Sequence, residues 1–511
     1  MTMTHPGLPE AWQWLVAVFM LFALLRILLQ RPGTLMARSA TMDVNRLPLL
    51  GSLARFFNAS PWPLLFLKAV VASLFLLVIA AGLFGTPVPE RNLATTLTWT
   101  LWWAGIVIVI FFLGSAWCAV CPWDTLASWL VKRKLWRRAD AGASLGLRVP
   151  KLWRSVWPAL AMFIGLTWLE LGVGVTTNPY MTAVLALIMV VLATIYMAVF
   201  EGKAFCKHVC PVGRTVGFYS QLAMVELRPR STQTCADCKT LECYHGTEEI
   251  EPCPTHLVMG RLTQSTYCTA CSACTMSCPH DNVGWRLRSP AVEAIQHARP
   301  HWDEAWFMLG LMALTTFHGI TMMPFWEQGM STFAQLIGDS GQLLWSFSLG
   351  MLIILIVPIL LYAGLIRFMQ VLLPEKIAFQ QLFARLAFVS LPLAFTYHIA
   401  HNLNHLIRES RGFTSVLMNP LGRDTLPLSS NELHMRHMNP LIPEQLLFGL
   451  QAILIAFGFW LALQVLKQRS TDVLSEAQRL HAWHLLPGVA FILVITVFNL
   501  WLLAQPMVMR M

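Results

Sequence analysis

The sequence predicts an all-α integral membrane protein of about ten transmembrane helices, with one α+β module between them. The chain has 511 residues, of which 56% are hydrophobic and only 12% are charged, whereas soluble domains carry about 25% charged residues. Ten stretches are apolar over roughly the 20 residues that a membrane-spanning helix needs. One long polar segment, residues 201–303, interrupts them. Most of this chain is therefore expected to lie in lipid.

The polar segment divides the chain into three domains. We place an N-terminal membrane domain of five helices at residues 1–200, the module at 201–303 and a C-terminal membrane domain of five helices at 304–511. The helices are expected near residues 12–30, 62–84, 96–117, 155–175, 181–200, 304–324, 344–366, 383–406, 445–466 and 484–505.

Basic residues indicate which side of the membrane each loop occupies. Loop 31–61 carries four arginines against one acidic residue, and loop 118–154 contains KRKLWRR at 132–138, whereas the connections after the second and fourth helices are nearly uncharged. Positively charged loops stay in the cytoplasm. We therefore expect the module to be cytoplasmic and both termini outside, in the inner (cytoplasmic) membrane of a bacterium. The start of the chain lacks the positive region of a cleavable signal peptide.

The net charge of +10 is carried by these loops and the helix ends, so it does not indicate nucleic acid binding. The sequence has no G-x-G-x-x-G after a strand, no phosphate loop, no C-x-x-C-H haem site and no hydrolase triad. We expect no nucleotide cofactor in this chain, and therefore expect partners to supply both ends of any electron path.

Cysteines dominate the module. All twelve cysteines lie between Cys118 and Cys278, and the last four follow the spacing C-x2-C-x2-C-x3-C-P. This is the run that binds iron–sulfur clusters in bacterial ferredoxins, in which the fourth cysteine ligates the other of two clusters. A looser run, C-x2-C-x4-C-x9-C-P, precedes it. We expect a ferredoxin-like module with two 4Fe-4S clusters and crossed ligation. One cluster would be held by Cys235, Cys238, Cys243 and Cys278, and the other by Cys268, Cys271, Cys274 and Cys253.

Two other interpretations of the cysteines are open. An even number of cysteines is typical of disulfide-bonded modules, and C-x2-C pairs also suit structural zinc. Neither explains two runs of four cysteines that each end in Cys-Pro. A reducing cytoplasm also preserves thiolate ligands, which agrees with the orientation predicted from the loops.

The remaining four cysteines form two pairs at helix ends. Cys118 and Cys121 follow the third helix, and Cys206 and Cys210 follow the fifth, so both pairs are expected at the cytoplasmic surface. Together they could hold a third 4Fe-4S cluster. Alternatively they are helix-end thiols, redox-active or simply buried. His208, between the second pair, could tune a cluster through a hydrogen bond.

The element C-x3-C-P-x-G at Cys206–Gly213, placed after a membrane helix and before the double run, resembles the membrane-bound 4Fe-4S polyferredoxins. That family includes the quinol dehydrogenase subunit of periplasmic nitrate reduction, nitrous-oxide-reductase maturation proteins and the cluster protein linked to copper-oxidase assembly. The resemblance covers about residues 96–290. Its members typically carry two C-x3-C-P elements, whereas the first is shortened here to Cys118-x2-Cys121, with Trp123 or Asp124 in the place of the glycine.

Histidines within the predicted helices form a second candidate site. Ionisable residues inside spans are costly and generally functional. His318 and His398 are expected at the same depth in the outer half of the membrane, and His401 and His405 follow on the same helix face. They could ligate haem b, form a quinol site that takes up protons, or merely hold helices together.

Three weaker groups of histidines remain. His301, His481 and His484 could serve a second haem near the inner face, but histidines are common at helix ends. His434 and His437, with Met435 and Met438, could bind a metal outside the membrane, although such a pair is more often a solvated loop.

These observations favour a membrane-bound electron-transfer protein. We expect it to relay electrons between a cytoplasmic donor or acceptor protein and the quinone pool or a membrane cytochrome, as the electron-transfer subunit of a quinone-linked oxidoreductase. The alternative is a maturation or assembly factor that reduces a metal or sulfur on a respiratory metalloenzyme.

Overall fold

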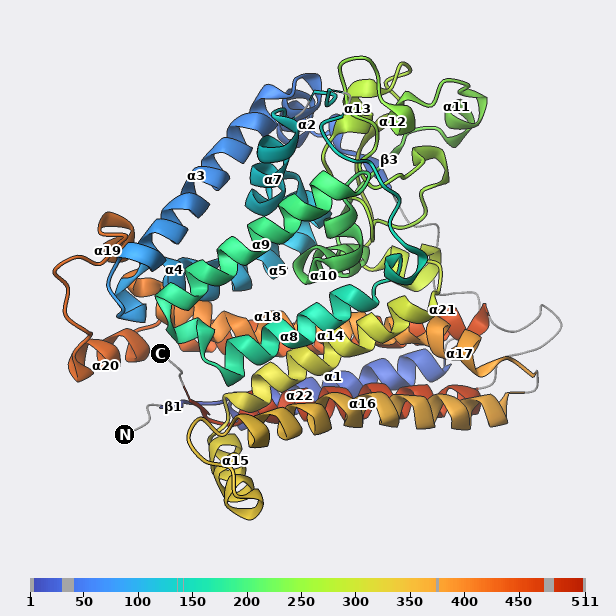
Figure 1. The fold of residues 1–511 in the computed structure, drawn as a ribbon. Coiled ribbons are helices and arrows are strands. Elements are labelled where there is room, and N and C mark those ends of the chain that lie inside the picture. The colour runs from blue at the N-terminus through green and yellow to red at the C-terminus, as the bar shows by residue number, and fades with distance from the viewer. Residues whose placement is uncertain are drawn as a thin grey trace.

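The computed structural model describes residues 4–29, 41–135, 137–140, 142–373, 376–472 and 482–508. Most of the chain is helical. Figure 1 shows long helices lying nearly side by side in the lower part of the molecule, with the cysteine-rich segment at the upper right. The oblique α3 and α9 lie above the lower layer, on the same side as that segment.

A helix occurs at each of the ten predicted positions. The long helices are α1 (Glu10–Leu29), α3 (Trp62–Phe84), α5 (Trp103–Leu113), α8 (Trp157–Gly172), α9 (Pro179–Val199), α14 (Trp302–Thr321), α16 (Leu344–Leu372), α18 (Ser390–Glu409), α21 (Glu444–Thr471) and α22 (Leu486–Ala504). Shorter helices adjoin several of them, namely α4 (Leu93–Thr95), a π-helix (Thr96–Trp102), α6 (Trp117–Val120), α7 (Pro122–Lys132), α15 (Pro324–Ile337), α17 (Phe379–Leu386) and α19 (Phe413–Met418). A separate helix, α20 (Ser430–Met438), lies in the loop between α19 and α21.

Eight helical stretches of the described chain are long and apolar enough to cross a membrane. The pair α14 and α15 would add a ninth if it formed one span, but it bends by 90° at Met322–Met323. The remaining helix, α8, is apolar but has only 16 residues. The chain is thus a membrane protein, built from helices where the sequence predicts them.

Helix α18 is the centre of the C-terminal membrane domain. The span that contains it is 94% buried and has a mean hydropathy of only 1.4, whereas α16 is 28% buried with a mean hydropathy of 2.8. Lipid-facing helices must be apolar, but a helix enclosed by other helices can carry polar groups that face the bundle interior. Helices α5, α14 and α21 pack around α18. This enclosure is what allows α18 to carry three histidines and an arginine.

The cysteine-rich module is α+β, as predicted, and is larger than predicted. Strands β3 (Val225–Pro229) and β4 (Val283–Leu287) pair antiparallel, and β2 (Met42–Asp43) adds a third strand to β4. Short helices α11 (Thr232–Asp237), α12 (Glu242–His245) and α13 (Ala273–Ser277) carry the cysteine runs. The loop between the first two membrane helices therefore contributes a strand to the module.

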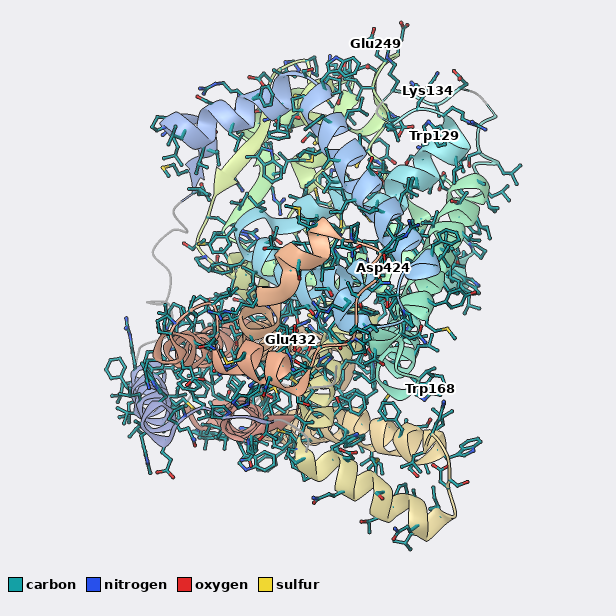
Figure 2. The ribbon with its side chains drawn as sticks, turned by 90° about the vertical axis from the view of Figure 1, so that its left-hand side faces the viewer. Trp129, Lys134, Trp168, Glu249, Asp424 and Glu432 are labelled. Carbon is teal, nitrogen blue, oxygen red and sulfur yellow. The ribbon has the colours of Figure 1, made fainter. Side chains whose placement is uncertain are left out.

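The end of α7 also contacts the module. Lys132 Nζ pairs with Glu251 at 2.8 Å, and the Arg138 amide donates to the Glu249 carbonyl at 2.9 Å. Figure 2 shows Trp129 and Lys134 at the same upper edge as Glu249. Both basic loops therefore contact the module.

A buried charge network joins the module to the membrane domain. Glu293 is fully buried and pairs with Arg228 and Arg288, and it accepts the Ser265 amide at 2.7 Å. The segment after it is held by Arg469 of α21, which donates to the Ala298 carbonyl at 3.0 Å. The cysteine run that begins three residues after Ser265 is thereby fixed to both parts of the molecule.

Candidate functional site

The first set of thiols is Cys235, Cys238, Cys243 and Cys278. The four residues line one cavity of about 30 Å³. Burial raises the pKa of Cys243, and the thiols of Cys278, Cys235 and Cys238 raise it further. Asn282 serves the set twice, since its amide donates to Cys278 Sγ at 3.4 Å and its side chain to Cys235 Sγ at 3.3 Å. Cysteines from both runs thus meet here.

The second set is Cys268, Cys271, Cys274 and Cys253. Burial raises the pKa of Cys274 well above its ordinary value, and the neighbouring thiols of Cys271, Cys268 and Cys253 add to the shift. Ala270, whose φ is +48°, donates its amide to Cys268 Sγ at 3.4 Å, and Leu257 donates to Cys253 Sγ at 3.3 Å. Hydrogen bonds of this kind tune the potential of iron–sulfur clusters.

The third set is Cys118, Cys121, Cys206 and Cys210. Burial raises the pKa of Cys210 well above its ordinary value, followed by the thiols of Cys206, Cys121 and Cys118. Cys121 and Cys210 each precede a helix that begins with proline, α7 and α10 (Pro211–Tyr219). The positive ends of two helices therefore lie beside the thiols, where negative charge is stabilised. The Gly213 amide donates to Cys210 Sγ at 3.2 Å.

The first Cys-Pro element has a charged residue where the second has a glycine. Asp124 lies three residues after Cys121, as Gly213 does after Cys210. The Asp124 carboxylate pairs with Lys203 Nζ at 2.7 Å, and both side chains are nearly buried. Lys203 immediately precedes the second element, so the ion pair ties the two elements together. His208 lies buried between Cys206 and Cys210, and burial lowers its pKa to about 4.

The donor sets fit iron–sulfur clusters. All twelve cysteines are free thiols, so no disulfide forms. Among the described residues, no group of three or more His, Cys, Asp or Glu side chains is gathered closely enough to hold a single metal ion. In a 4Fe-4S cluster each thiolate binds a different iron. At the thiols whose pKa is raised, among them Cys243, Cys274 and Cys210, a bound metal would take the place of the proton.

The three sets adjoin one another in order. Cys243 of the first set is among the thiols that raise the pKa of Cys274 in the second. Lys203 interacts with Cys271 of the second set and with Cys206 of the third; burial lowers the pKa of Lys203, but Asp124 and these thiols together raise it above its ordinary value. The sets therefore form a row from the outer part of the module to the membrane domain.

A cavity of about 370 Å³ continues the row into the membrane. Its wall includes Cys121 and Pro122 of the first Cys-Pro element and Pro211 and Val212 of the second. Helices α3, α8 and α9, the π-helix Thr96–Trp102 with the first residue of α5, and one tryptophan each from α6 and α7 supply the rest of the wall, which is almost entirely apolar. The size is typical of ligand pockets, which are mostly apolar with a few polar groups.

The polar groups of this cavity are specific. The buried indole N–H groups of Trp102, Trp117 and Trp123 have no hydrogen-bond partner within the described chain. Glu170, near the end of α8, lines the cavity at its other side. Buried donors are nearly always paired, so these indoles point to a ligand with acceptor oxygens. Glu170 was not predicted as a site residue from the sequence, although an acidic residue in an apolar helix generally indicates a functional site.

The membrane histidines lie next to this cavity. A second, smaller cavity of about 20 Å³ is lined by His318, His398 and His401, and it shares Thr167 and Glu170 with the larger one. His318 was expected to face His398, but its ring lies against His401, with centroids 5.3 Å apart. The neighbour of His318 is therefore one turn further along α18, whereas His398 meets the Tyr219 hydroxyl at 3.3 Å.

A haem b does not fit between these histidines as they lie. The cavity they line is far smaller than a porphyrin, and the contact between His318 and His401 leaves no slot for one. His405 is also occupied, because its Nδ1 lies 2.8 Å from Glu409 and its Nε2 lies 3.0 Å from Met322 Sδ. We therefore assign no haem to this group.

The other histidine predictions gain no support. His484 is buried and His301 is exposed, while His481 lies outside the described residues. His434 is exposed on α20, and the side chains of His437 and Met438 lie outside the described part. The second haem and the outer metal site stay predictions.

Comparisons with known proteins support the iron–sulfur interpretation. The family described as "4Fe-4S binding domain" matches residues 95–139 and 182–222, which contain the four cysteines of the third set. A protein of Escherichia coli (strain K12), "Putative electron transport protein YccM", is 29% identical over 118 residues. That match covers 22% of this chain and only 30% of the relative. No solved structure matches.

Proposed function

We propose that this membrane protein, which matches the 4Fe-4S binding domain over residues 95–139 and 182–222, transfers electrons between a partner protein at its cysteine-rich module and a quinone in the tryptophan-lined cavity. When bound, the clusters supply one-electron carriers. The protein determines the order of the clusters along the electron path, because the three sets of thiols adjoin one another from the module to the membrane domain.

One observation supports this proposal above the others, namely that the wall of the cavity contains a ligand of the third set. Cys121 and Pro122 line it directly. A quinone ring in the cavity would therefore lie next to that set, and its carbonyl oxygens could accept from the unpaired indoles of Trp102, Trp117 and Trp123. The apolar wall of α3 and α9 suits the isoprenoid tail.

We further propose that ten helices cross the membrane and that the module is cytoplasmic, with three clusters and both termini outside. The basic residues of loops 31–61 and 118–154 support this orientation. A reporter fused after Pro290 should behave as cytoplasmic and one fused near Ser430 as external. The opposite pattern would contradict the orientation.

The proposal that quinone binds in this cavity is tested by a substitution that fills the cavity. Ala186 of α9 lines the cavity, and Ala186→Phe should place a ring in the space where the quinone binds. Ile188 of the same helix is 48% exposed on the outer surface, so Ile188→Phe is the matched control. Overfilling a packed site costs about 1–3 kcal/mol, so iron content is checked in both variants.

The measurement is reduction of a short-chain quinone by protein that has been reduced with dithionite and then freed of excess dithionite, with quenching of tryptophan fluorescence as the binding assay. Ala186→Phe should abolish both, while Ile188→Phe and the wild type behave alike. Equal activity of all three proteins, with iron retained, would mean that quinone does not use this cavity.

No described contact favours the alternative role of a maturation factor. Its strongest feature was the outer segment with His434 and His437, and the described side chains there form no ligand group. That role stays a prediction, as does the identity of the partner protein.

A further inference from the structure

Five titratable side chains form a continuous line through the C-terminal membrane domain. His318 Nδ1 lies 3.9 Å from the Glu170 carboxylate. The ring of His318 lies 5.3 Å from that of His401, which lies 5.3 Å from that of His405. His405 Nδ1 then lies 2.8 Å from Glu409. We call this line the relay.

The regular spacing follows from α18. His401, His405 and Glu409 are four residues apart, so they stack on one face of the helix, and each turn advances 5.4 Å. Glu170 of α8 and His318 of α14 extend the line sideways to the large cavity. Three separate helices thus supply one path, which an accident of composition does not explain.

The first part of the relay, from Glu170 through His318 to His401, has room for water. The small cavity of about 20 Å³ is lined by Glu170, His318 and His401 together with Asn402 and Thr315. A cavity holds a water molecule when its volume reaches about 10–15 Å³ and polar groups surround it. One water there would join carboxylate and imidazoles by hydrogen bonds.

His401 is the most informative member. Its side chain is 1% exposed, and neither ring nitrogen has a hydrogen-bond partner within the described chain. Burying an imidazole without a partner is costly, so a residue that only stabilised the bundle would be expected to be paired. An imidazole with two open nitrogens can accept a proton at one and release it at the other.

The two ends of the relay lie in different surroundings. Glu170 lines the proposed quinone cavity. Glu409 ends α18, accepts from Thr100 at 3.1 Å and precedes the exposed Arg411. Figure 1 shows α19 and α20, which follow α18, at the left end of the molecule, away from the cysteine-rich module at the upper right. Figure 2 looks onto that end, with Asp424 and Glu432 facing the viewer.

We propose that Glu170, His318, His401, His405 and Glu409 conduct protons between the quinone cavity and the membrane face opposite the cysteine-rich module. The inference rests on the proposed function. Reduction of a quinone consumes two electrons and two protons, Q + 2e⁻ + 2H⁺ → QH₂, and quinol oxidation releases them. The electrons pass on the cluster side of the cavity, whereas the protons pass at Glu170 and leave or enter at Glu409. Electron transfer would therefore be coupled to the proton gradient.

The test uses the whole protein in liposomes of neutral lipid that contain quinone and a trapped pH indicator. Dithionite crosses membranes slowly, so among the protein copies it reduces only those whose module faces outward. Because dithionite also reduces quinones directly, the rate in protein-free liposomes is subtracted. Quinone reduction by these copies should draw one luminal proton per electron, and the lumen should become alkaline. The variants are His401→Leu and Glu409→Gln, with Thr396→Val as the control, since the Thr396 hydroxyl bonds only within α18.

Both relay variants should slow luminal proton uptake at least about tenfold, with cluster reduction by dithionite unchanged. Glu409→Gln keeps the result decisive if His401→Leu does not fold, because Glu409 lies at the end of the helix. Thr396→Val should match the wild type.

Two outcomes would overturn the inference, and they are distinguishable. Protons taken up from the outer medium, with quinone reduced normally, would refute the relay and leave the proposed function standing. Clusters that reduce without any reduction of quinone by the wild type would refute the proposed function and the relay with it.

Discussion

Lys203 Nζ lies 2.7 Å from the Asp124 carboxylate, and this ion pair joins the two Cys-Pro elements of the third set. Asp124 stands where the second element has Gly213, so the departure from the glycine motif is matched by a lysine three residues before the second element. The substituted position thus has a structural partner, and the shortened spacing from Cys118 to Cys121 does not prevent the four thiols from meeting.

Breaking this ion pair should release the third cluster. Asp124→Asn leaves the buried ammonium of Lys203 without its counter-charge, and loss of one member of a buried pair typically costs about 3–5 kcal/mol. We expect non-haem iron to fall from about twelve per chain to about eight, since a 4Fe-4S cluster holds four irons. Iron analysis of anaerobically purified protein checks this.

The matched control is the exposed ion pair of Lys134 and Asp140, whose side chains are 33% and 79% exposed. Asp140→Asn should leave the iron content unchanged, because exposed pairs contribute at most about 1 kcal/mol. Iron near twelve in Asp124→Asn would show that the pair does not support a cluster.

Crossed ligation gives a second prediction. Cys274→Ala and Cys278→Ala remove residues of one run, yet the structure places Cys274 with Cys253, Cys268 and Cys271, and Cys278 with Cys235 and Cys243. The two variants should lose different signals in electron paramagnetic resonance of the reduced protein. Loss of the same signal from both would mean that each run holds its own cluster.

Gly260 gives a third prediction, which removes no ligand. A Cβ at this position would lie 2.7 Å from Cys235 Cβ and 3.6 Å from its sulfur. Gly260→Ala should therefore displace Cys235 and deplete the first cluster, while the signals of the other two remain. Gly105→Ala is the control, since nothing lies within 4 Å of its added Cβ. An unchanged electron paramagnetic resonance spectrum of Gly260→Ala would show that the loop around Gly260 accommodates the added methyl group and that the first cluster is retained.

The buried carboxylate of Glu293 gives a fourth prediction. Glu293→Gln leaves Arg228 and Arg288 with only Glu226 as a counter-charge, and we expect the module to lose about 3 kcal/mol of stability. Limited proteolysis of the membrane-bound protein should then cut within residues 225–290 at lower temperature than in the wild type. Glu249→Gln, at the exposed edge of the module, should have no such effect.

Local patterns predicted much of the fold. Hydropathy predicted the position of every long membrane helix, because a helix that lies in lipid or inside a bundle must itself be apolar over most of its length. Cysteine spacing also anticipated the sets that the structure brings together, since ligands of one cluster lie close in sequence. The α+β character of the module was expected from its ferredoxin-like cysteine runs, although strand β2 came from a distant loop.

Contacts between helices could not be predicted in the same way. The partner of His318 depends on the axial offset of α14 and α18, and a shift of one turn replaces His398 by His401. Glu170 becomes significant only because α8 brings it to His318 and to the tryptophan-lined cavity. Which residues of two helices become neighbours depends on the angle at which the helices pack, and this angle cannot be inferred from a single sequence.

The pairing of the chain ends restricts how the helices can thread the bilayer. Thr4 and His5 of β1 (Thr4–His5) pair with Val508 and Met507 of β5 (Met507–Val508), so the two ends meet on one face. A chain that returns to its starting face has crossed an even number of times. The pairing therefore agrees with the ten-helix topology proposed above, in which the short α8 and the bent α14–α15 pair both cross.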